Sequence, residues 1–223
     1  MTKPSDFFLG ILDFFAVLMP GAVVTWLSAS YLPAALAAYL DVTGTKGDGG
    51  PALAWVVILF ASYVLGHFVF MVGSILDRQY DRWRDWKHPK KKDHTYQAAK
   101  QLYESSSPNL SSGHFTTLKW AKAYVQIQSP AARLEIDRFD ANSKFFRSFV
   151  VVSVLAAVHY GLGAHAFGLA AGAVTLALLS FWRYCDQRWK ASELSYATAV
   201  MLHGIKTKAA VAKTGDAKTA NGE

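Results

Sequence analysis

The chain has 223 residues, of which 17% are charged and 52% hydrophobic, and its formal net charge is +7. In a soluble domain of this length, charged residues make up about a quarter of the positions and are spread over the whole chain. Here residues 51–76 and 148–182 carry no charge, and residues 7–40 carry only Asp13. This distribution excludes an ordinary soluble globular domain and indicates an all-α protein that crosses a membrane several times.

The first apolar block, residues 7–40, contains the first predicted span. A helix needs about 20 apolar residues to cross a hydrocarbon core of about 30 Å, so this block is long for one crossing. Pro20 interrupts the block, because proline removes a backbone hydrogen bond and kinks a helix. We therefore predict a span near 16–38, with residues 7–19 lying along the interface or forming the lower half of a steep helix. The sequence lacks a cleavage pattern, so we expect a retained anchor rather than a removable signal peptide.

The second block, residues 51–76, matches one crossing and completes a predicted amino-terminal membrane hairpin over residues 1–76. His67 lies inside this span. A polar residue in lipid marks either a functional position or a side chain bonded to another helix, so His67 is the candidate functional residue within the membrane. Gly66 and Gly73 share one face of the span and permit close contact with another helix.

Charge returns at Asp77, where the predicted cytosolic helical segment, residues 77–144, begins. Aromatic side chains recur every three residues among alternating charges, and the same aromatic and basic pattern returns after the last apolar block. Such residues are typical of the headgroup level of a membrane. The predicted interface residues are Tyr80, Arg82, Trp83, Trp86, Arg188 and Trp189. His88 and Pro89 should end this helix, and we expect Lys90, Lys91 and Lys92 to contact anionic lipid at about 1 kcal/mol each.

Two shorter helices are predicted in the cytosolic segment, near 94–104 and 115–128, with a flexible loop at 105–113. The second has an apolar stripe formed by Phe115, Leu118, Ala121 and Val125. A helix opening at Ser129 and Pro130 is the predicted partner for this stripe, because these are a capping residue and a proline at the first helical position. Its proposed packing face is formed by Ile136, Phe139 and Phe146. With no breaker before His159, we predict that this helix continues directly into the third span.

The third block is too long for one crossing and has two glycines near its middle, between Tyr160 and His165. We predict a tight turn there and a second membrane hairpin over residues 145–184, with spans near 146–161 and 165–183. Small residues at every fourth position, Ala164, Gly168 and Gly172, form a predicted helix-packing face. A juxtamembrane cytosolic helix should follow over residues 185–205, and the small, polar residues 206–223 should form a disordered tail.

The distribution of basic residues along the chain predicts the number of membrane crossings. Residues 77–147 hold 14 Lys and Arg and residues 183–223 hold seven, whereas the two opposite connections, 41–50 and 161–165, hold Lys46 alone. Basic residues near membrane ends mark the cytoplasmic side. Both basic stretches lie in the cytoplasm if an even number of crossings separates them. We therefore predict four transmembrane helices in the cell membrane (the inner membrane), a small helical cytosolic segment between spans two and three, and both termini in the cytoplasm.

The sequence contains no phosphate-binding glycine loop, zinc signature or nucleophile elbow, so we assign no catalytic residue, cofactor or metal. The single cysteine, Cys185, is interpreted as a small buried hydrophobic residue. We expect a non-enzymatic oligomeric module that couples the cytosolic helices to the membrane, as an effector, a channel-like protein or a scaffold. Its expected partners are the lipid bilayer, further copies of the chain and a cytosolic protein that binds residues 94–144; nucleic acid is not expected.

The alternative is a membrane-bound enzyme that acts on lipid headgroups at the cytoplasmic interface. Its polar groups would be Asp77, Asp81, Arg82 and His88, which lie close together in the sequence just after the second apolar block. Their spacing matches no catalytic pattern with a physical basis.

Overall fold

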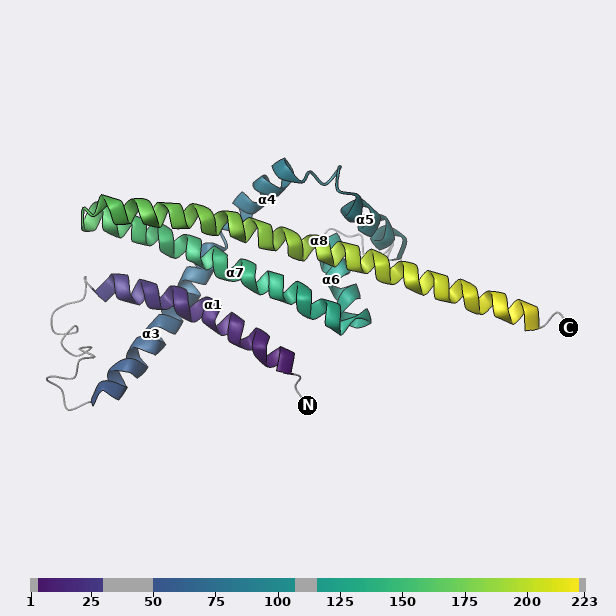
Figure 1. The fold of residues 1–223 in the computed structure, drawn as a ribbon, viewed down its shortest axis with the longest axis horizontal. Helices are drawn as coiled ribbons and strands as arrows, with labels where there is room; N and C mark the ends of the chain where they lie inside the picture. Colours follow the sequence, from purple (N-terminus) through teal and green to yellow (C-terminus); the bar gives the residue numbers. More distant parts are fainter. Residues whose placement is uncertain (1–3, 30–49, 107–115, 221–223) are drawn as a thin grey trace. The chain divides into compact units, whose positions relative to one another are not determined.

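The computed structural model describes residues 4–29, 50–106 and 116–220. Every regular element in these ranges is helical, so the predicted all-α fold class is confirmed (Figure 1). The elements are α1 (Pro4–Ala29), α3 (Gly50–Gly73), α4 (Leu76–Lys87), α5 (His94–Ser106), α6 (Thr117–Gln128), α7 (Pro130–Val158), the π-helical turn η2 (His159–Gly163) and α8 (Phe167–Ala220).

These helices form two compact units, which we describe separately. The first unit comprises Met1–Trp83 and Asp140–Gln187, and the second comprises Arg84–Phe139 and Arg188–Glu223. Helices α4, α7 and α8 each contribute residues to both units.

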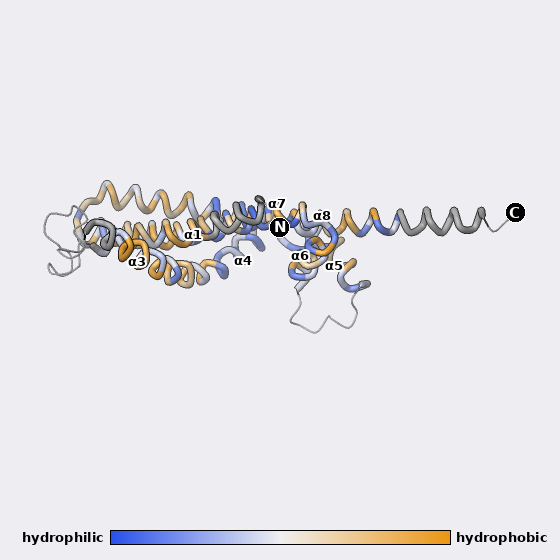
Figure 2. Tube along the Cα trace, turned by 90° about the horizontal axis from the view of Figure 1, so that it is seen from below, coloured by the Kyte–Doolittle hydropathy of each residue, from blue (hydrophilic) through white to orange (hydrophobic). Residues whose placement is uncertain are grey.

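Three helical stretches of the described residues are long and apolar enough to cross a membrane, namely Trp55–Gly73, Pro130–Gly163 and Phe167–Lys208. Large apolar side chains on them face outward: Phe60 is 70% exposed and Leu178 is 67% exposed. Figure 2 shows hydrophobic residues along much of α3. Contiguous apolar surface of this kind is rare on soluble monomers, so these helices are compatible with a multi-pass membrane protein.

Helix α1 runs without interruption through Pro20, so the proline does not separate residues 7–19 from the rest of the block. The side chain of Pro20 is fully buried in the first unit. Proline is tolerated within membrane helices when neighbouring groups compensate for the missing hydrogen bond. The apolar stretch that the structure describes, Phe14–Ser28, is shorter than a crossing. Residues 30–38 of the predicted first span lie outside the described residues, and four crossings remain a prediction.

Helices α1 and α3 cross in close contact in the first unit, and two glycines form this contact (Figure 1). A Cβ atom added to Gly21 would lie 1.7 Å from the carbonyl oxygen of Ser62, and one added to Gly66 would lie 2.1 Å from that of Val17. The hydroxyl groups of Thr25 and Ser62 lie 3.1 Å apart beside the crossing and share a hydrogen bond. Gly66 therefore allows backbone-to-backbone contact, the role that small residues have in membrane helix pairs.

The second apolar helix ends at Gly73, before the predicted limit at residue 76, and does not continue directly into the charged helix that follows. A turn at Ser74 and Ile75 separates α3 from α4. The hydroxyl of Ser74 donates to the carbonyl of Met71 at 2.6 Å, and a serine bonded in this way competes with the helical backbone pattern. Helix α4 ends at Lys87, immediately before His88 and Pro89, as predicted.

Helices α7 and α8 are joined by a tight turn (Figure 1). Helix α7 has no break from Pro130 to Val158, as predicted, and the turn that follows contains the predicted glycines. The amide of Ala166 donates to the carbonyl of Tyr160 at 2.7 Å, and His165 has a φ of 50°. Ala164 lies in this turn and precedes α8, so it does not extend the face of Gly168 and Gly172 along one helix.

Helix α8 extends further than predicted. The sequence predicts a juxtamembrane helix over residues 185–205 and a disordered tail over residues 206–223, whereas α8 continues to Ala220. The composition explains the difference, because alanine and lysine are strong helix formers even where no apolar face is present. The low hydrophobicity of this segment led to the wrong prediction.

The second unit has a hydrophobic core of its own, formed by α5, α6 and parts of α7 and α8. Its buried residues are Ala99, Tyr103, Trp120, Ala121, Val125, Ile136, Tyr196 and Ala199. The predicted stripe of α6 is therefore buried at Ala121 and Val125, and Ile136 of α7 packs on it as expected. Phe146, assigned to the same packing face, belongs instead to a cluster of the first unit. Phe115 and most of the predicted loop lie outside the described residues.

Candidate functional site

A partly buried ion pair in the first unit connects two helices of the described chain. Arg147 of α7 donates from Nη1 to both carboxylate oxygens of Asp77 in α4, at 3.2 and 3.4 Å. Tyr184 of α8 donates from its hydroxyl to Oδ1 of Asp77 at 2.7 Å. The side chain of Arg147 is 9% exposed and that of Asp77 is 37% exposed. We call these three residues the Asp77 cluster; it joins three helices through one carboxylate.

Apolar and aromatic groups surround the Asp77 cluster. The guanidinium carbon of Arg147 lies 4.5 Å from the centre of the Phe70 ring, and a Cβ on Gly73 would lie 3.3 Å from Cγ of Arg147. Tyr80, Tyr184 and Cys185 form the buried core beside it, which confirms Cys185 as a buried residue. Nε of Arg147 is buried and has no hydrogen-bond partner within the described ranges. An arginine in such surroundings needs its counter-charge, because an unpaired buried charge is strongly unfavourable.

The hydroxyls of Ser148 and Ser153 on α7 are also buried, and neither has a hydrogen-bond partner among the residues that the structure describes. Both side chains are less than one-tenth exposed. Buried polar groups normally have a protein or water partner, so these two serines are exceptional positions in the first unit. Together with Arg147, the two serines place polar groups of α7 inside an otherwise apolar unit. The sequence pattern does not reveal that these groups are buried.

The predicted polar residue of the second span, His67, lies on the exposed side of α3. Its ring packs edge-on against Tyr63, with ring centres 4.6 Å apart. Gly73 packs against Arg147, whereas a Cβ atom on Gly168 or Gly172 would meet nothing within 4 Å. The two glycines of α8 therefore make no close helix contact within the described chain.

The predicted interface residues occupy different surroundings. Tyr80 is only 2% exposed and packs in the core near Tyr184, so its side chain does not lie at an outer surface. Trp83 is half-buried beside Tyr80. Trp86 is 81% exposed and Arg82 is also exposed. Arg188 and Trp189 are half-buried, whereas Lys90, Lys91 and Lys92 are all exposed.

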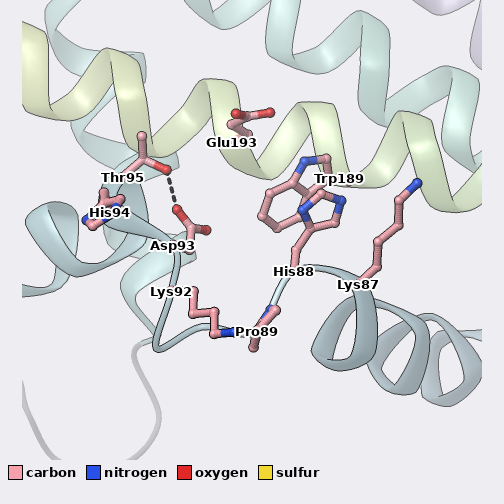
Figure 3. Close-up of a pocket in the computed structure, with 9 residues that line it drawn as sticks. All are labelled: Lys87, His88, Pro89, Lys92, Asp93, His94, Thr95, Trp189 and Glu193. Carbon is pink, nitrogen blue, oxygen red and sulfur yellow. Dashed lines mark hydrogen bonds between the residues drawn. The ribbon is translucent and has the colours of Figure 1, made fainter.

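The second unit contains a cavity of about 370 Å³. It lies between the connection from α4 to α5 and one side of α8 (Figure 3). It is lined by Lys87, His88, Pro89, Lys92, Asp93, His94, Thr95, Trp189 and Glu193. The rings of His88 and Trp189 stack almost in parallel, with centres 4.1 Å apart and an interplanar angle of 10°. We call this space the Trp189 cavity.

Hydrogen bonds fix the loop that forms one wall of the Trp189 cavity. The amide of Lys92 donates to the carbonyl of Pro89 at 2.8 Å, and the side-chain amide of Gln97 donates to the carbonyl of Lys90 at 2.9 Å. Asp93 precedes α5 as its capping residue: its Oδ1 accepts from the hydroxyl of Thr95 at 2.6 Å and from the amide of Tyr96 at 3.0 Å. The sequence indicated the basic run but not the cavity, because Trp189 and Glu193 follow about a hundred residues later.

The four polar groups of the alternative enzyme belong to two units: Asp77, Asp81 and Arg82 to the first and His88 to the second. The carboxylate of Asp77 already accepts hydrogen bonds from two other helices. No group of three metal-ligating side chains that could hold an ion occurs in the described residues. Comparisons of the chain with protein-family models, with curated proteins and with solved structures find no match.

Proposed function

We propose that this chain is a non-enzymatic, oligomeric membrane module that couples its cytosolic helices to its membrane spans. The observation that carries this proposal is the double role of α7 and α8. Helix α7 contributes Ile136 to the core of the second unit and Arg147 to the Asp77 cluster. Helix α8 contributes Tyr196 to the same core and Tyr184 to the same cluster. A shift of either helix driven by a cytosolic partner therefore acts on the bonds of Asp77.

The Asp77 cluster suits the role of a coupling point because its bonds are directional. The carboxylate of Asp77 is shared between a guanidinium on one helix and a hydroxyl on another. Charge-assisted hydrogen bonds are strong at about 2.7–2.9 Å and weaken when the geometry departs from this. The bonds from Arg147 measure 3.2 and 3.4 Å and the bond from Tyr184 measures 2.7 Å. A small movement of α7 against α8 would therefore change the balance between them, as a coupling element requires.

We propose that α8 supplies the contact between copies of the chain. Gly168 and Gly172 are four residues apart on α8, and the space beside each is open. The crossing of α1 and α3 uses glycine to bring two backbones together within this chain, and the same chemistry acts between chains in membranes. Exposed apolar side chains such as Leu169 and Leu176 flank the two glycines and would be covered by a second α8.

Crosslinking in native membranes tests this assembly. The double variant Gly168→Ile/Gly172→Ile should lose crosslinked dimers and higher species, because two branched side chains hold the helices apart. The matched control is Gly204→Ile, which makes the same change on the same helix at a position that also has open space. Wild type and control should give the same crosslinked species. A chain that stays monomeric in membranes without any substitution contradicts the oligomer.

The alternative, an enzyme acting on lipid headgroups, predicts that alanine replacements at Asp81, Arg82 and His88 abolish the activity. The coupling module predicts instead that a disruption of Asp77 or Arg147 alters the response to a cytosolic partner bound at residues 94–144. Proteins captured by photocrosslinkers placed in α5 and α6 identify that partner. A phenotype that depends on His88 but not on Asp77 would favour the enzyme.

A further inference from the structure

The walls of the Trp189 cavity carry charges of both signs in equal number. Lys87 and Lys92 are positive and Asp93 and Glu193 are negative, while two histidines, an indole, Pro89 and Thr95 complete the lining. Figure 3 shows Lys87 and Lys92 on different sides of the stacked His88 and Trp189 rings, with Asp93 and Glu193 nearby. A site for a simple anion needs an excess of positive charge. The cavity is therefore matched to a ligand that has both a negative and a positive group.

We propose that the Trp189 cavity binds a phosphate ester that carries a primary ammonium group, the chemistry of a phosphoethanolamine headgroup. Lys92 would hold the phosphate oxygens, with Lys87 adding positive charge on the other side of the stacked rings, and Glu193 together with the second oxygen of Asp93 would accept from the ammonium. The binding site stands independently of the coupling role. The ligand could be a phospholipid or a soluble ester. A phospholipid ligand depends on the proposed membrane location, whereas a soluble ester does not.

Groups available for a ligand support this assignment. Lys92 and Glu193 form no ion pair within the described residues, although both line the cavity. Oδ1 of Asp93 is occupied by the cap of α5, whereas Oδ2 makes no hydrogen bond within the described part of the chain. The loop that carries Lys92 and Asp93 is fixed by its own hydrogen bonds. A loop whose backbone is already fixed loses little conformational entropy when it binds a ligand.

The size and aromatic content of the cavity further limit the class of ligand that fits it. A volume of about 370 Å³ is near the lower end of small-molecule sites, which range from about 300 to 1,000 Å³, so it accommodates a headgroup but not acyl chains. Quaternary ammonium groups are recognised by cages of several aromatic rings. The cavity has one indole, and the ring of His88 covers one of its faces. Carboxylates beside a single indole suit a primary ammonium, which can donate hydrogen bonds to them.

Binding of short-chain lipids to the purified full chain in neutral detergent tests the proposal. Dissociation constants are measured for dioctanoyl-phosphatidylethanolamine, for the phosphatidylglycerol analogue, which lacks the ammonium, and for free O-phosphoethanolamine. The wild type should bind the ethanolamine lipid more tightly than the glycerol lipid. Lys92→Gln and Glu193→Gln should each weaken this binding on the order of tenfold, because each removes the partner of one charge.

Two matched controls separate the cavity from general surface charge. Lys91→Gln removes a positive charge from the same basic run, and Glu135→Gln removes a negative charge from an exposed position in the same unit; neither residue lines the cavity. Both controls should bind like the wild type. Competition by free O-phosphoethanolamine identifies a soluble source, and binding of the lipid alone identifies the membrane; either result supports the site.

Three results would overturn the proposal. Tighter binding by Glu193→Gln would show that the ligand is a simple anion. Equal binding of the two lipids by the wild type would show that the ammonium is not recognised. Equal effects of Lys91→Gln and Lys92→Gln would show diffuse attraction of the basic run. None of these results affects the crosslinking of Gly168→Ile/Gly172→Ile, so failure of the cavity and failure of the proposed module are distinguishable.

Discussion

At the scale of single residues, substitutions in the Asp77 cluster test how the first unit is held together. Replacement of Asp77 by asparagine removes the charge that Arg147 needs in a largely buried position. We expect the free energy of unfolding to fall by about 2–3 kcal/mol, the cost of losing hydrogen bonds to a charged group. Thermal unfolding of the full chain in mild detergent measures the change.

A double-mutant cycle shows whether the three residues act together. Tyr184→Phe removes one hydrogen bond to the same carboxylate and should cost about 1–2 kcal/mol alone. In combination with Asp77→Asn it should cost less, because the bond is already weakened. Asp81→Asn is the control, since it makes the same change at an exposed position of α4; there the change should stay within about 0.5 kcal/mol. Additive effects in the double variant would contradict a shared cluster.

The sequence could not reveal this cluster, although it contains hints of it. Arg147 was counted among the cytosolic basic residues, and Asp77 was assigned to a solvated helix. They are 70 residues apart, and their pairing depends on how α4 and α7 pack. The hint is local: Arg147 is the last charge before the long uncharged stretch 148–182, and Asp77 is the first charge after 51–76. A charged side chain at the end of an uncharged stretch can be buried in the packed unit when an opposite charge lies near it.

At the scale of elements, local signals predicted most helix boundaries. Ser129 and Pro130 predicted the start of α7. In the structure, the amide of Ala132 donates to the hydroxyl of Ser129 at 3.4 Å. The glycines near residue 162 predicted the turn before α8. The break at Ser74 was missed, because a continuous apolar pattern conceals a single turn. The contribution of Tyr196 to the core of the second unit was also missed, since that contact depends on tertiary packing.

The crossing of α1 and α3 gives a prediction at this scale. Gly66→Ala places a methyl group against the backbone of Val17, which cannot be moved as a side chain can. The two helices must separate, and we expect a loss of about 1–3 kcal/mol in the free energy of unfolding, the usual cost of overpacking. Gly204→Ala is the control, because α8 is open at that position and alanine is the better helix former. Unchanged thermal unfolding of Gly66→Ala in detergent would show that this crossing is not needed for stability.

At the scale of the whole molecule, the number of membrane crossings decides where the amino terminus lies. Three helices have the length and composition of spans, and α1 supplies a shorter apolar stretch. If α7 and α8 both cross, the two basic portions of the chain share one side, which is the cytoplasm under the positive-inside rule. If residues 30–38 complete a fourth crossing, the amino terminus lies in the cytoplasm as well; with three crossings it lies outside.

Single-cysteine labelling decides between these arrangements. The chain has one cysteine, Cys185, which is buried, so Cys185→Ala provides a background without thiols. Into it we would introduce Thr2→Cys, Thr45→Cys, Asn109→Cys, Gly163→Cys or Thr214→Cys, one at a time. In intact cells, a membrane-impermeant maleimide should label positions 45 and 163, and in inverted vesicles it should label positions 2, 109 and 214. Labelling of position 2 in intact cells would show three crossings instead of four. Labelling of positions 109 and 214 from opposite sides requires an odd number of crossings between them, and the basic residues would then no longer predict the orientation of this chain.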